Sequence, residues 1–459
     1  MLFPARSVIL TLMVAAGTTE SSPLSVRSPY VVKDSHHVPR KWSNVGAAPQ
    51  GHMIHLHIGL RQSQFDELER HLYEGKFSVT HSFRVINDII VSDPSHARYG
   101  QHLTEHEVNE LIRPSEDALD LVHDWLFDHG VEASSLQYSP AKDWIKVSLP
   151  VSEVESLLHT KYSIFEHEEG GRIVRAPMWS LPKHLHEHID VIQPTNSFFR
   201  AKAQRSTIKT DKHRAGWKPP KPISYPSNAT LSQVCNETAV TPLCLRTLYG
   251  TVDYVVQAAG KNQIGLNDFL GESNNRSDVK LFLESYRPEA AAAADQFKVE
   301  VIANGTNDQN QLNQTELAAG TDLEGNLDAE TILGISWPTP LTAFTTGGSP
   351  PFQPDDETPT DTNEPYLTWV QYVLAHPNPP QVISTSYDDD EQSVPLSFAR
   401  SVCNSFAQLG ARGVSLLFAS GDSGVGADGY VYPRAFLDRP PVSASLYLSL
   451  LHLNSTNQI

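Results

Sequence analysis

The sequence is short of cysteine, of basic residues and of long apolar runs, and each shortage excludes a class of protein. Three cysteines in 459 residues allow at most one internal disulfide, and their spacing suggests no zinc site. Lys and Arg number 35 against 53 Asp and Glu, so the net charge is −18. Such an acidic chain is a poor binder of nucleic acid or anionic membrane. Since no stretch reaches the roughly 18 apolar residues of a membrane span, we expect neither partner.

The N-terminus is typical of a secretory signal peptide over residues 1–17. Arg6 is the only early charge, and the apolar run over 7–16 is too short to cross a membrane, although a short anchor is the alternative. Glycosylation sequons follow at Asn228, Asn236, Asn275, Asn304 and Asn313, with a sixth at Asn454 in a tail of doubtful framework. We therefore expect a secreted, extracellular glycoprotein.

The cysteines fit that compartment. Cys235 and Cys244 are close enough in sequence to close a short loop, and secretion would let them oxidise. Cys403 lies in a helical pattern, where it is either buried or without its partner.

Residues 30–200 alternate short strands and helices, which indicates a small α+β domain. Two helix starts carry the capping-box pattern: Thr104 with Glu107, and Ser152 with Glu155. Further elements are expected as a strand at 54–58, a helix at 65–72, a helix from 115 to about 130, a strand at 144–149 and a hairpin over 162–175. A linker rich in Lys, Arg, Pro and Ser follows at 201–228 and is either a processing site or a simple tether.

Residues 229–459 alternate strands and helices at longer range. Strands are expected at 264–266, 297–302, 382–386 and 414–419, and helices at 278–286, 366–374 and 394–409. This βαβ order predicts a parallel sheet. Active sites of such sheets gather at the carboxyl ends of the strands.

Two places in this part could carry chemistry. Glu324 and Asp328 are four residues apart, so on a helix they share one face. Two carboxylates held together cannot both ionise easily, and a shared proton would let the pair act as a general base in acid. The alternative is a solvated acidic first turn. Asp422 follows the apolar strand at 414–419 in a Gly-rich turn. There it either donates a hydrogen bond to an oxyanion or only stabilises the turn.

The acidic run at 387–391 ends another expected strand. Four acids could mark a cation site or an amino-group pocket. We favour a solvated loop that caps the next helix, because that is what such a run more often forms.

Together these residues resemble the sedolisins, a family of serine-carboxyl peptidases, and most closely their fungal tripeptidyl-peptidase branch. Segments 382–387 and 411–414 are similar to the family framework, and the run SDPSHARYGQHLT at 92–104 resembles the family propeptide. The resemblance implies a subtilisin-like fold and a Ser-Glu-Asp triad. In it, Glu324 is the general base for the serine, Asp328 supports Glu324, and Asp422 is the oxyanion donor.

The expected fold class is therefore α/β: a truncated subtilisin-like parallel sheet with helices over 229–459, preceded by an α+β propeptide domain over 30–200. The resemblance implies that the propeptide occupies the active site as an intramolecular inhibitor and is removed in acid. The substrates would be peptides and proteins, with tripeptidyl and endopeptidase action both open.

The sequence departs from the family pattern twice. Residues 75–91 separate propeptide segments that usually adjoin, which we interpret as a retained intron or a gene-model error. Only 459 − 424 = 35 residues follow Gly424, and they contain neither the expected G-T-S-x-[SA]-x-P helix with its nucleophile nor the two-acid calcium loop. Calcium, which the complete fold implies, thus has no ligands in this chain.

The prediction is a secreted, acid-acting serine-type peptidase that releases N-terminal tripeptides, made as a proenzyme and here without its nucleophilic serine. The alternative is an inactive truncated pseudoenzyme, or a propeptide-like inhibitory or binding fragment. A generic acidic binding protein is disfavoured by the motifs. We also expect the propeptide-like domain to be ordered and the truncated half to be marginally stable, because a shortened sheet exposes an unpaired edge.

Overall fold

The structure, a computed structural model, describes residues 28–73, 99–168, 170–198, 202–203, 230–235, 240–347, 365–388 and 394–419. The expected signal peptide, the 75–91 segment, Asn228, Asn236, Asp422 and the C-terminal tail lie outside these residues. We call residues 28–198 the N-terminal region and residues 230–419 the C-terminal region.

The N-terminal region is built on antiparallel pairs. Its largest sheet has the order β4-β5-β3-β9, and a smaller one has the order β2-β6-β7. The strands are β1 (Tyr30–Ser35), β2 (Trp42–Ala47), β3 (Met53–Leu60), β4 (Gln137–Tyr138), β5 (Trp144–Pro150), β6 (Ser163–His167), β7 (Arg172–Arg175), β8 (Met178–Pro182) and β9 (Ile189–Gln193). The helices are α1 (Phe65–Tyr73), α2 (Glu105–Ile112), α3 (Glu116–Asp128) and α4 (Val151–Leu157). One face of the larger sheet packs on α3 and α4 around a core that includes Leu56, Val122 and Ile145.

Local sequence signals explain most of these elements. The capping box of Thr104 and Glu107 is confirmed at the start of α2, and Ser115 caps α3. The expected box of Ser152 and Glu155 is wrong. The helix starts one residue after Pro150, which caps it without a side-chain hydrogen bond. Glu155 is buried and accepts hydrogen bonds from Lys161 Nζ and Tyr162 N instead.

The C-terminal region holds a parallel sheet with the order β12-β13-β11-β14-β16. Its strands are β11 (Ile264–Asp268), β12 (Lys298–Ile302), β13 (Leu341–Thr346), β14 (Val382–Thr385) and β16 (Ser415–Phe418), and a short antiparallel pair joins β10 (Lys202–Ala203) to β15 (Tyr387–Asp388). The helices are α5 (Leu231–Val234), α6 (Pro242–Leu248), α7 (Arg276–Tyr286), α8 (Gln314–Ala319), α9 (Leu323–Ser336), α10 (Pro365–Ala375) and α11 (Leu396–Ala411). The expected parallel sheet is confirmed, and the fold is mixed α/β.

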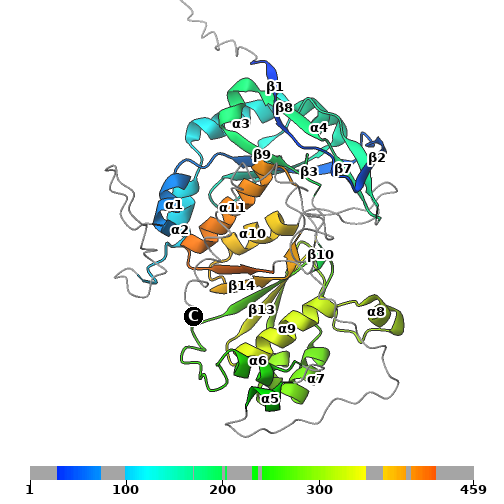
Figure 1. Ribbon diagram of the computed structural model, residues 1–459. Helices are drawn as coiled ribbons and strands as arrows, with labels where there is room; N and C mark the ends of the chain where they lie inside the picture. Colours follow the sequence, from blue (N-terminus) through cyan, green and yellow to red (C-terminus); the bar gives the residue numbers. More distant parts are fainter. Residues whose placement is uncertain are drawn as a thin grey trace, which may run out of the picture.

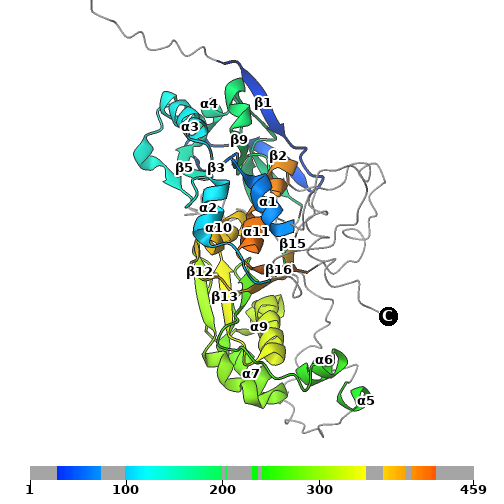
Figure 2. The ribbon, with the colours of Figure 1, turned by 90° about the vertical axis from the view of Figure 1, so that its left-hand side faces the viewer.

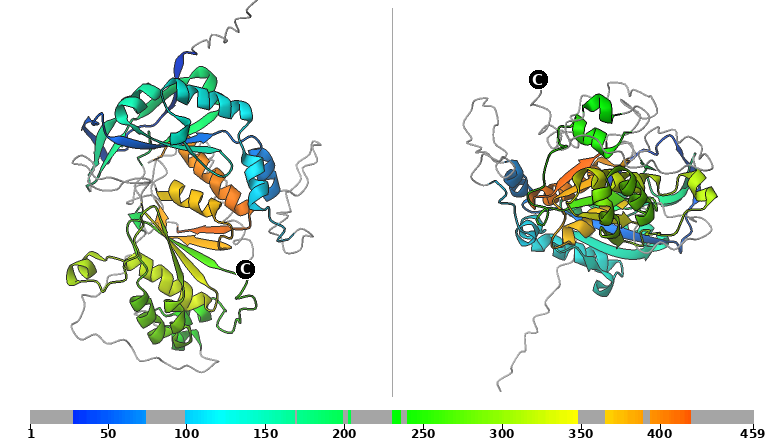
Figure 3. Two further views of the ribbon diagram at one scale, coloured as in Figure 1. Left: turned by 180° about the vertical axis from the view of Figure 1, so that it is seen from behind. Right: turned by 90° about the horizontal axis from the view of Figure 1, so that it is seen from below.

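The layers stack in one direction (Figure 1). Helices α10 and α11 cover the face of the parallel sheet that looks toward the N-terminal region, and α7 and α9 cover the opposite face. The views from the side and from behind keep the same order, with α11 between the parallel sheet and the N-terminal sheet (Figure 2 and the left panel of Figure 3). No helix within the described ranges is long and apolar enough to span a membrane.

Helix α11 joins the two regions because it is buried on both sides. Toward α1 and α2 it presents Ala407 and Ala411, which pack in one cluster with Leu68, Val108 and Ile112. The chain before α2 adds a backbone hydrogen bond from Leu103 N to Ala411 O, at 2.9 Å. Toward the N-terminal sheet, larger side chains of α11 join a second cluster that contains Trp144 of β5 and Val191 of β9.

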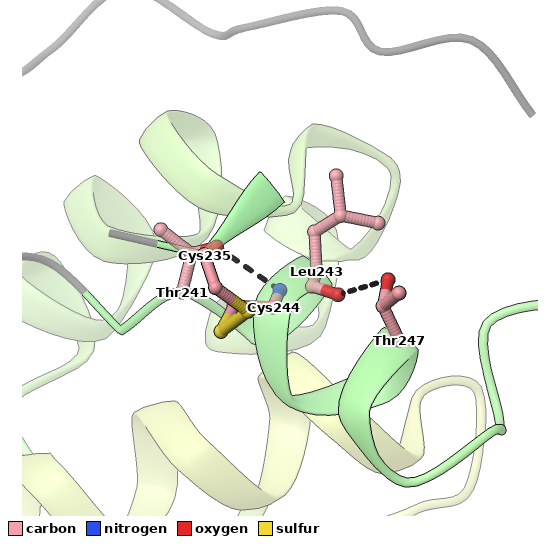
Figure 4. Close-up of a disulfide and its surroundings, with 5 residues drawn as sticks. All are labelled: Cys235, Thr241, Leu243, Cys244 and Thr247. Carbon is pink, nitrogen blue, oxygen red and sulfur yellow. Dashed lines mark hydrogen bonds between the residues drawn. A yellow bond between two sulfur atoms is a disulfide. The ribbon is translucent and has the colours of Figure 1, made fainter. Parts of the chain in front are cut away.

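The expected disulfide is confirmed. Cys235 and Cys244 are bonded, with their Cα atoms 4.8 Å apart, and they join α5 to α6 (Figure 4). Thr241 caps α6 by accepting a hydrogen bond from Cys244 N at 3.2 Å. Cys403 is buried in α11 and is not part of a disulfide.

Candidate functional site

The loop that follows β11 is hydrogen-bonded to the start of α9, and this sets the position of the expected carboxylate pair. Ser273 N donates to Asp322 Oδ1 at 2.9 Å, and the Asn274 amide donates to Gly325 O at 2.7 Å. The approach leaves no room for a side chain at Gly325, where a Cβ would lie 2.8 Å from Ser273 O. The carboxyl end of β11 and the first turn of α9 are therefore one unit.

Glu324 and Asp328 both lie on α9 beside this unit. Glu324 is 4% exposed, so the alternative of a solvated acidic turn does not describe it. Burial raises the pKa of Asp328 to about 6, although the Ser386 hydroxyl after β14 opposes the rise. A carboxyl group with this pKa carries a proton through most of the acid range. Asp328 thus links α9 electrostatically to the end of a second strand of the parallel sheet.

Sequence reasoning missed a third carboxyl group at this place. Asp268 is the last residue of β11 and is completely buried. Its carboxyl oxygens make no well-formed hydrogen bond among the described residues, although the side chain of Asn274 is close enough to oppose the rise of its pKa. Burial raises its pKa well above the usual range, and the negative charges of Asp328 and Glu272 raise it further. Asp268 therefore holds its proton more tightly than a carboxyl group in water, since burial penalises the charged form.

Tyr387 completes the cluster from the other side. Its ring is buried just beyond β14, next to Phe269. Burial raises the pKa of its hydroxyl well above 10.0, and the charges of Asp268, Glu272, Asp328 and Glu324 add to the rise. Four carboxyl groups from β11, its loop and α9 therefore lie around one phenol. The signal for the missed residues was a polar pair, Asn267 and Asp268, directly after an apolar strand.

The cluster of four carboxyl groups can hold and exchange protons in acid. Close carboxyl groups in a region with little water share protons, so their titrations are coupled and shift upward. One ionised member beside protonated neighbours is a base that works well below pH 7, because the remaining protons hold it in a hydrogen-bonded network.

The chain is similar to known proteins over most of its length. The family model of the pro-kumamolisin activation domain matches residues 88–198. The chain is 32% identical over 430 residues to tripeptidyl-peptidase SED2 of Arthroderma otae, covering 92% of this chain and 66% of that protein. It is 37% identical over 344 residues to probable tripeptidyl-peptidase SED3 of Trichophyton verrucosum, covering 73% and 54%. With tripeptidyl-peptidase sed4 of Aspergillus fumigatus the identity is 34% over 395 residues, covering 85% and 59%.

The chain belongs to the sedolisin family. It spans between about half and two thirds of the length of these relatives. The matched activation domain takes up most of the N-terminal region, so the antiparallel part of this sedolisin is its activation domain.

The backbone after the activation domain reaches the candidate site of this sedolisin. Lys202 and Ala203 form β10, which pairs antiparallel with Asp388 and Tyr387 of β15. The chain that leaves the activation domain therefore runs as an added strand beside Tyr387, at the end of the sheet that carries the carboxyl cluster. An extended segment added to a sheet edge is a common way to bind a peptide.

The remaining expected site residues of this sedolisin are Asp422, the acidic run at 387–391 and the glycosylation candidates. Asp422 and most of the acidic run at 387–391 lie outside the described residues. Asn304 and Asn313 are exposed, whereas Asn275 is buried and its Nδ2 donates to Asn310 O at 3.0 Å. A glycan on Asn275 would require this hydrogen bond to break. The described part of the chain contains no group of three or more His, Cys, Asp or Glu side chains placed to hold a metal ion.

Proposed function

We propose that this sedolisin is the proenzyme form of a secreted, acid-acting serine-type tripeptidyl-peptidase, with Glu324 as its general base. The observation that carries the proposal is the buried face of α9 with Glu324 and Asp328, next to Asp268 at the carboxyl end of β11. Buried carboxyl groups with raised pKa values at the carboxyl end of a parallel strand are typical of functional sites.

The proposed reaction is acyl transfer through a serine ester. Glu324 accepts the proton of the serine hydroxyl while its oxygen attacks the scissile carbonyl carbon, and the amine of the substrate leaves with a proton. Asp328 hydrogen-bonds Glu324 and holds the second proton of the pair. Asp422, protonated in acid, donates to the carbonyl oxygen as negative charge develops there. Water then hydrolyses the ester. The serine belongs to a G-T-S-x-[SA]-x-P segment that the printed sequence does not contain.

The activation domain is proposed to act as an intramolecular inhibitor. The pairing of β10 with β15 supports this, because a strand in that place would exclude a peptide substrate from the same edge. Separation of the domain and cleavage in the 201–228 linker would free the edge.

Tripeptide release and secretion complete the proposed function. Release of tripeptides is supported by the similarity to tripeptidyl-peptidases. Secretion is supported by the signal-peptide pattern and by the Cys235–Cys244 disulfide. Calcium, if the complete protein needs it, would be held by residues beyond those described, where it would order the loop that bears it.

A chimera tests the catalytic roles. Residues 1–426 of this chain would be joined to the corresponding C-terminal part of sed4 of Aspergillus fumigatus, and release of N-terminal tripeptides would be followed by mass spectrometry at pH 4. Glu324→Gln removes the base and is expected to lower kcat by about 100-fold to 10,000-fold. Glu284→Gln, on the exposed side of α7, is the matched control and leaves kcat unchanged.

The kcat of the Glu324→Gln variant decides whether Glu324 is the general base. A folded chimera whose Glu324→Gln variant keeps the parent kcat would show that Glu324 is not the base.

A further inference from the structure

A histidine is buried where the activation domain meets the C-terminal region. His57 lies in the middle of β3 and is 3% exposed. Neither of its ring nitrogens has a hydrogen-bond partner among the residues that the structure describes. An imidazole without partners destabilises a core position, since burying an unsatisfied polar group is unfavourable. The location of His57 ties this cost to the contact between the two regions.

Strand alternation places His57 on the face of the sheet that looks toward α11. Ile54, Leu56 and Ile58 face the core of the activation domain, so His57 and Gly59 face the other way. Gly59 lies against Trp144 and Val191, and those two side chains cluster with residues of α11 such as Val402 and Phe406. The burial of His57 on this face is therefore provided by the C-terminal region.

No acidic partner faces His57 from the packed elements. Its register partners are Lys146 on β5 and the uncharged Gln193 on β9. The charges that act on it are those of Lys146 and His55, both of which oppose protonation. On the other side of the contact, Arg400 is the only charged residue of α11 and is exposed, and α10 has no charged residue.

Protonation of this histidine therefore favours separation of the two regions. Burial lowers the pKa of His57 from 6.5 to about 3 while the regions are in contact. Once they separate, the ring is in water and its pKa returns toward 6.5. Because the lowered value belongs to the contact state, the contact is unaffected above pH 6.5 and weakens as the pH falls from 6.5 toward 3. Each pH unit in that window favours separation by about tenfold.

We propose that His57 is an acid sensor, whose protonation releases the activation domain from the C-terminal region. This sensor needs no acidic partner, because the free-energy cost of protonating the ring exists only while α11 covers it. Its meaning as activation of a proenzyme rests on the proposed function, whereas the separation itself does not.

Hydrogen exchange of the 459-residue chain tests the separation without any catalytic readout. Amide protection would be measured by mass spectrometry in peptides from α11 and β9, and in peptides from α3, which lies in the interior of the activation domain. Between pH 6.5 and 4.5, the opening constant of α11 and β9 should increase by about 50-fold, after correction for the intrinsic rate of exchange. Protection of α3 should persist, because the activation domain separates as a folded unit.

Variants isolate the histidine. His57→Leu removes the titrating group of β3 and should remove most of the 50-fold change, and His57→Gln should do the same if the leucine variant folds poorly. His106→Gln, at an exposed position of α2, is the matched control and should keep the parent behaviour. Equal pH dependence of the parent and both His57 variants would overturn the proposal. Loss of α3 protection in step with α11 would overturn it too, because the event would then be general unfolding.

Discussion

The carboxyl cluster should make this protein less stable as the pH rises, and Asp328 gives a measurable share of that effect. Its pKa is about 6 in the folded chain against the ordinary value of 3.8 for an aspartate in water. Because the folded value is raised, the native state holds this proton more tightly than the unfolded chain does. The stabilisation is complete below pH 3.8 and disappears as the pH rises through 6.

The size of the effect follows from the shift. About 2 pKa units, at 1.36 kcal/mol each, correspond to about 3 kcal/mol of unfolding free energy lost between pH 3.5 and pH 7. Asp328→Asn keeps the shape of the protonated acid but cannot ionise. The variant should therefore match the parent within about 1 kcal/mol at pH 3.5 and exceed it by about 3 kcal/mol at pH 7. Urea unfolding followed by tryptophan fluorescence at the two pH values measures both differences.

The matched control is Asp253→Asn, at an exposed position. It makes the same chemical change outside the cluster and should follow the parent at both pH values. If Asp328→Asn also follows the parent at pH 7, then Asp328 ionises in the folded chain as freely as in water. The argument that burial sets its protonation would then be wrong.

Three further predictions concern other parts of the chain. Burial raises the pKa of Glu330 to about 8, so Glu330→Gln should gain stability over the parent as the pH rises from 4.5 to 8; equal urea midpoints at pH 8 would contradict this. Gly413 has a φ of +85°, and a Cβ there would lie 2.4 Å from the His102 ring. Gly413→Ala should thus lower the unfolding free energy by about 1–3 kcal/mol, and an unchanged Tm would argue against it. Replacing Cys235 and Cys244 by serine should lower the unfolding free energy by about 2–4 kcal/mol. A urea midpoint equal to that of the parent would contradict this.

Sequence patterns found the elements whose signals are local. The capping box at Thr104, the hairpin around Gly170 and the four-residue spacing of Glu324 and Asp328 each depend on residues within one turn or loop. Such patterns survive folding because tertiary contacts reinforce them. The family resemblance added the meaning of the carboxylate pair, which spacing by itself could not supply.

The strand segments that the sequence did not predict share a physical cause. Strand β11 was expected to end at Leu266, yet it continues through Asn267 and Asp268, both completely buried. Strand β13 was not expected, because half of its six residues are threonines, and all six are buried. A one-dimensional pattern takes polar residues as exposed, and only the assembled sheet shows that polar side chains line its interior next to a site.

The burial of His57 is another feature that a local sequence pattern does not predict. Its alternation with Leu56 and Ile58 marks the outer side of a half-buried strand, where histidine is ordinary. What covers that side is α11, more than 300 residues away in the sequence. Contacts of that separation leave no trace in a local pattern.

Helix α11 presents side chains of two sizes to the activation domain. Toward α1 and α2 it offers Ala407, Gly410 and Ala411, which meet Leu68 and Leu72. Toward the N-terminal sheet it offers larger residues such as Phe406. Since hydrophobic free energy scales with apolar area, separation wets mostly the activation domain at the first contact and both partners at the second. The released inhibitor would therefore leave with two apolar patches, which favour aggregation and removal by proteases.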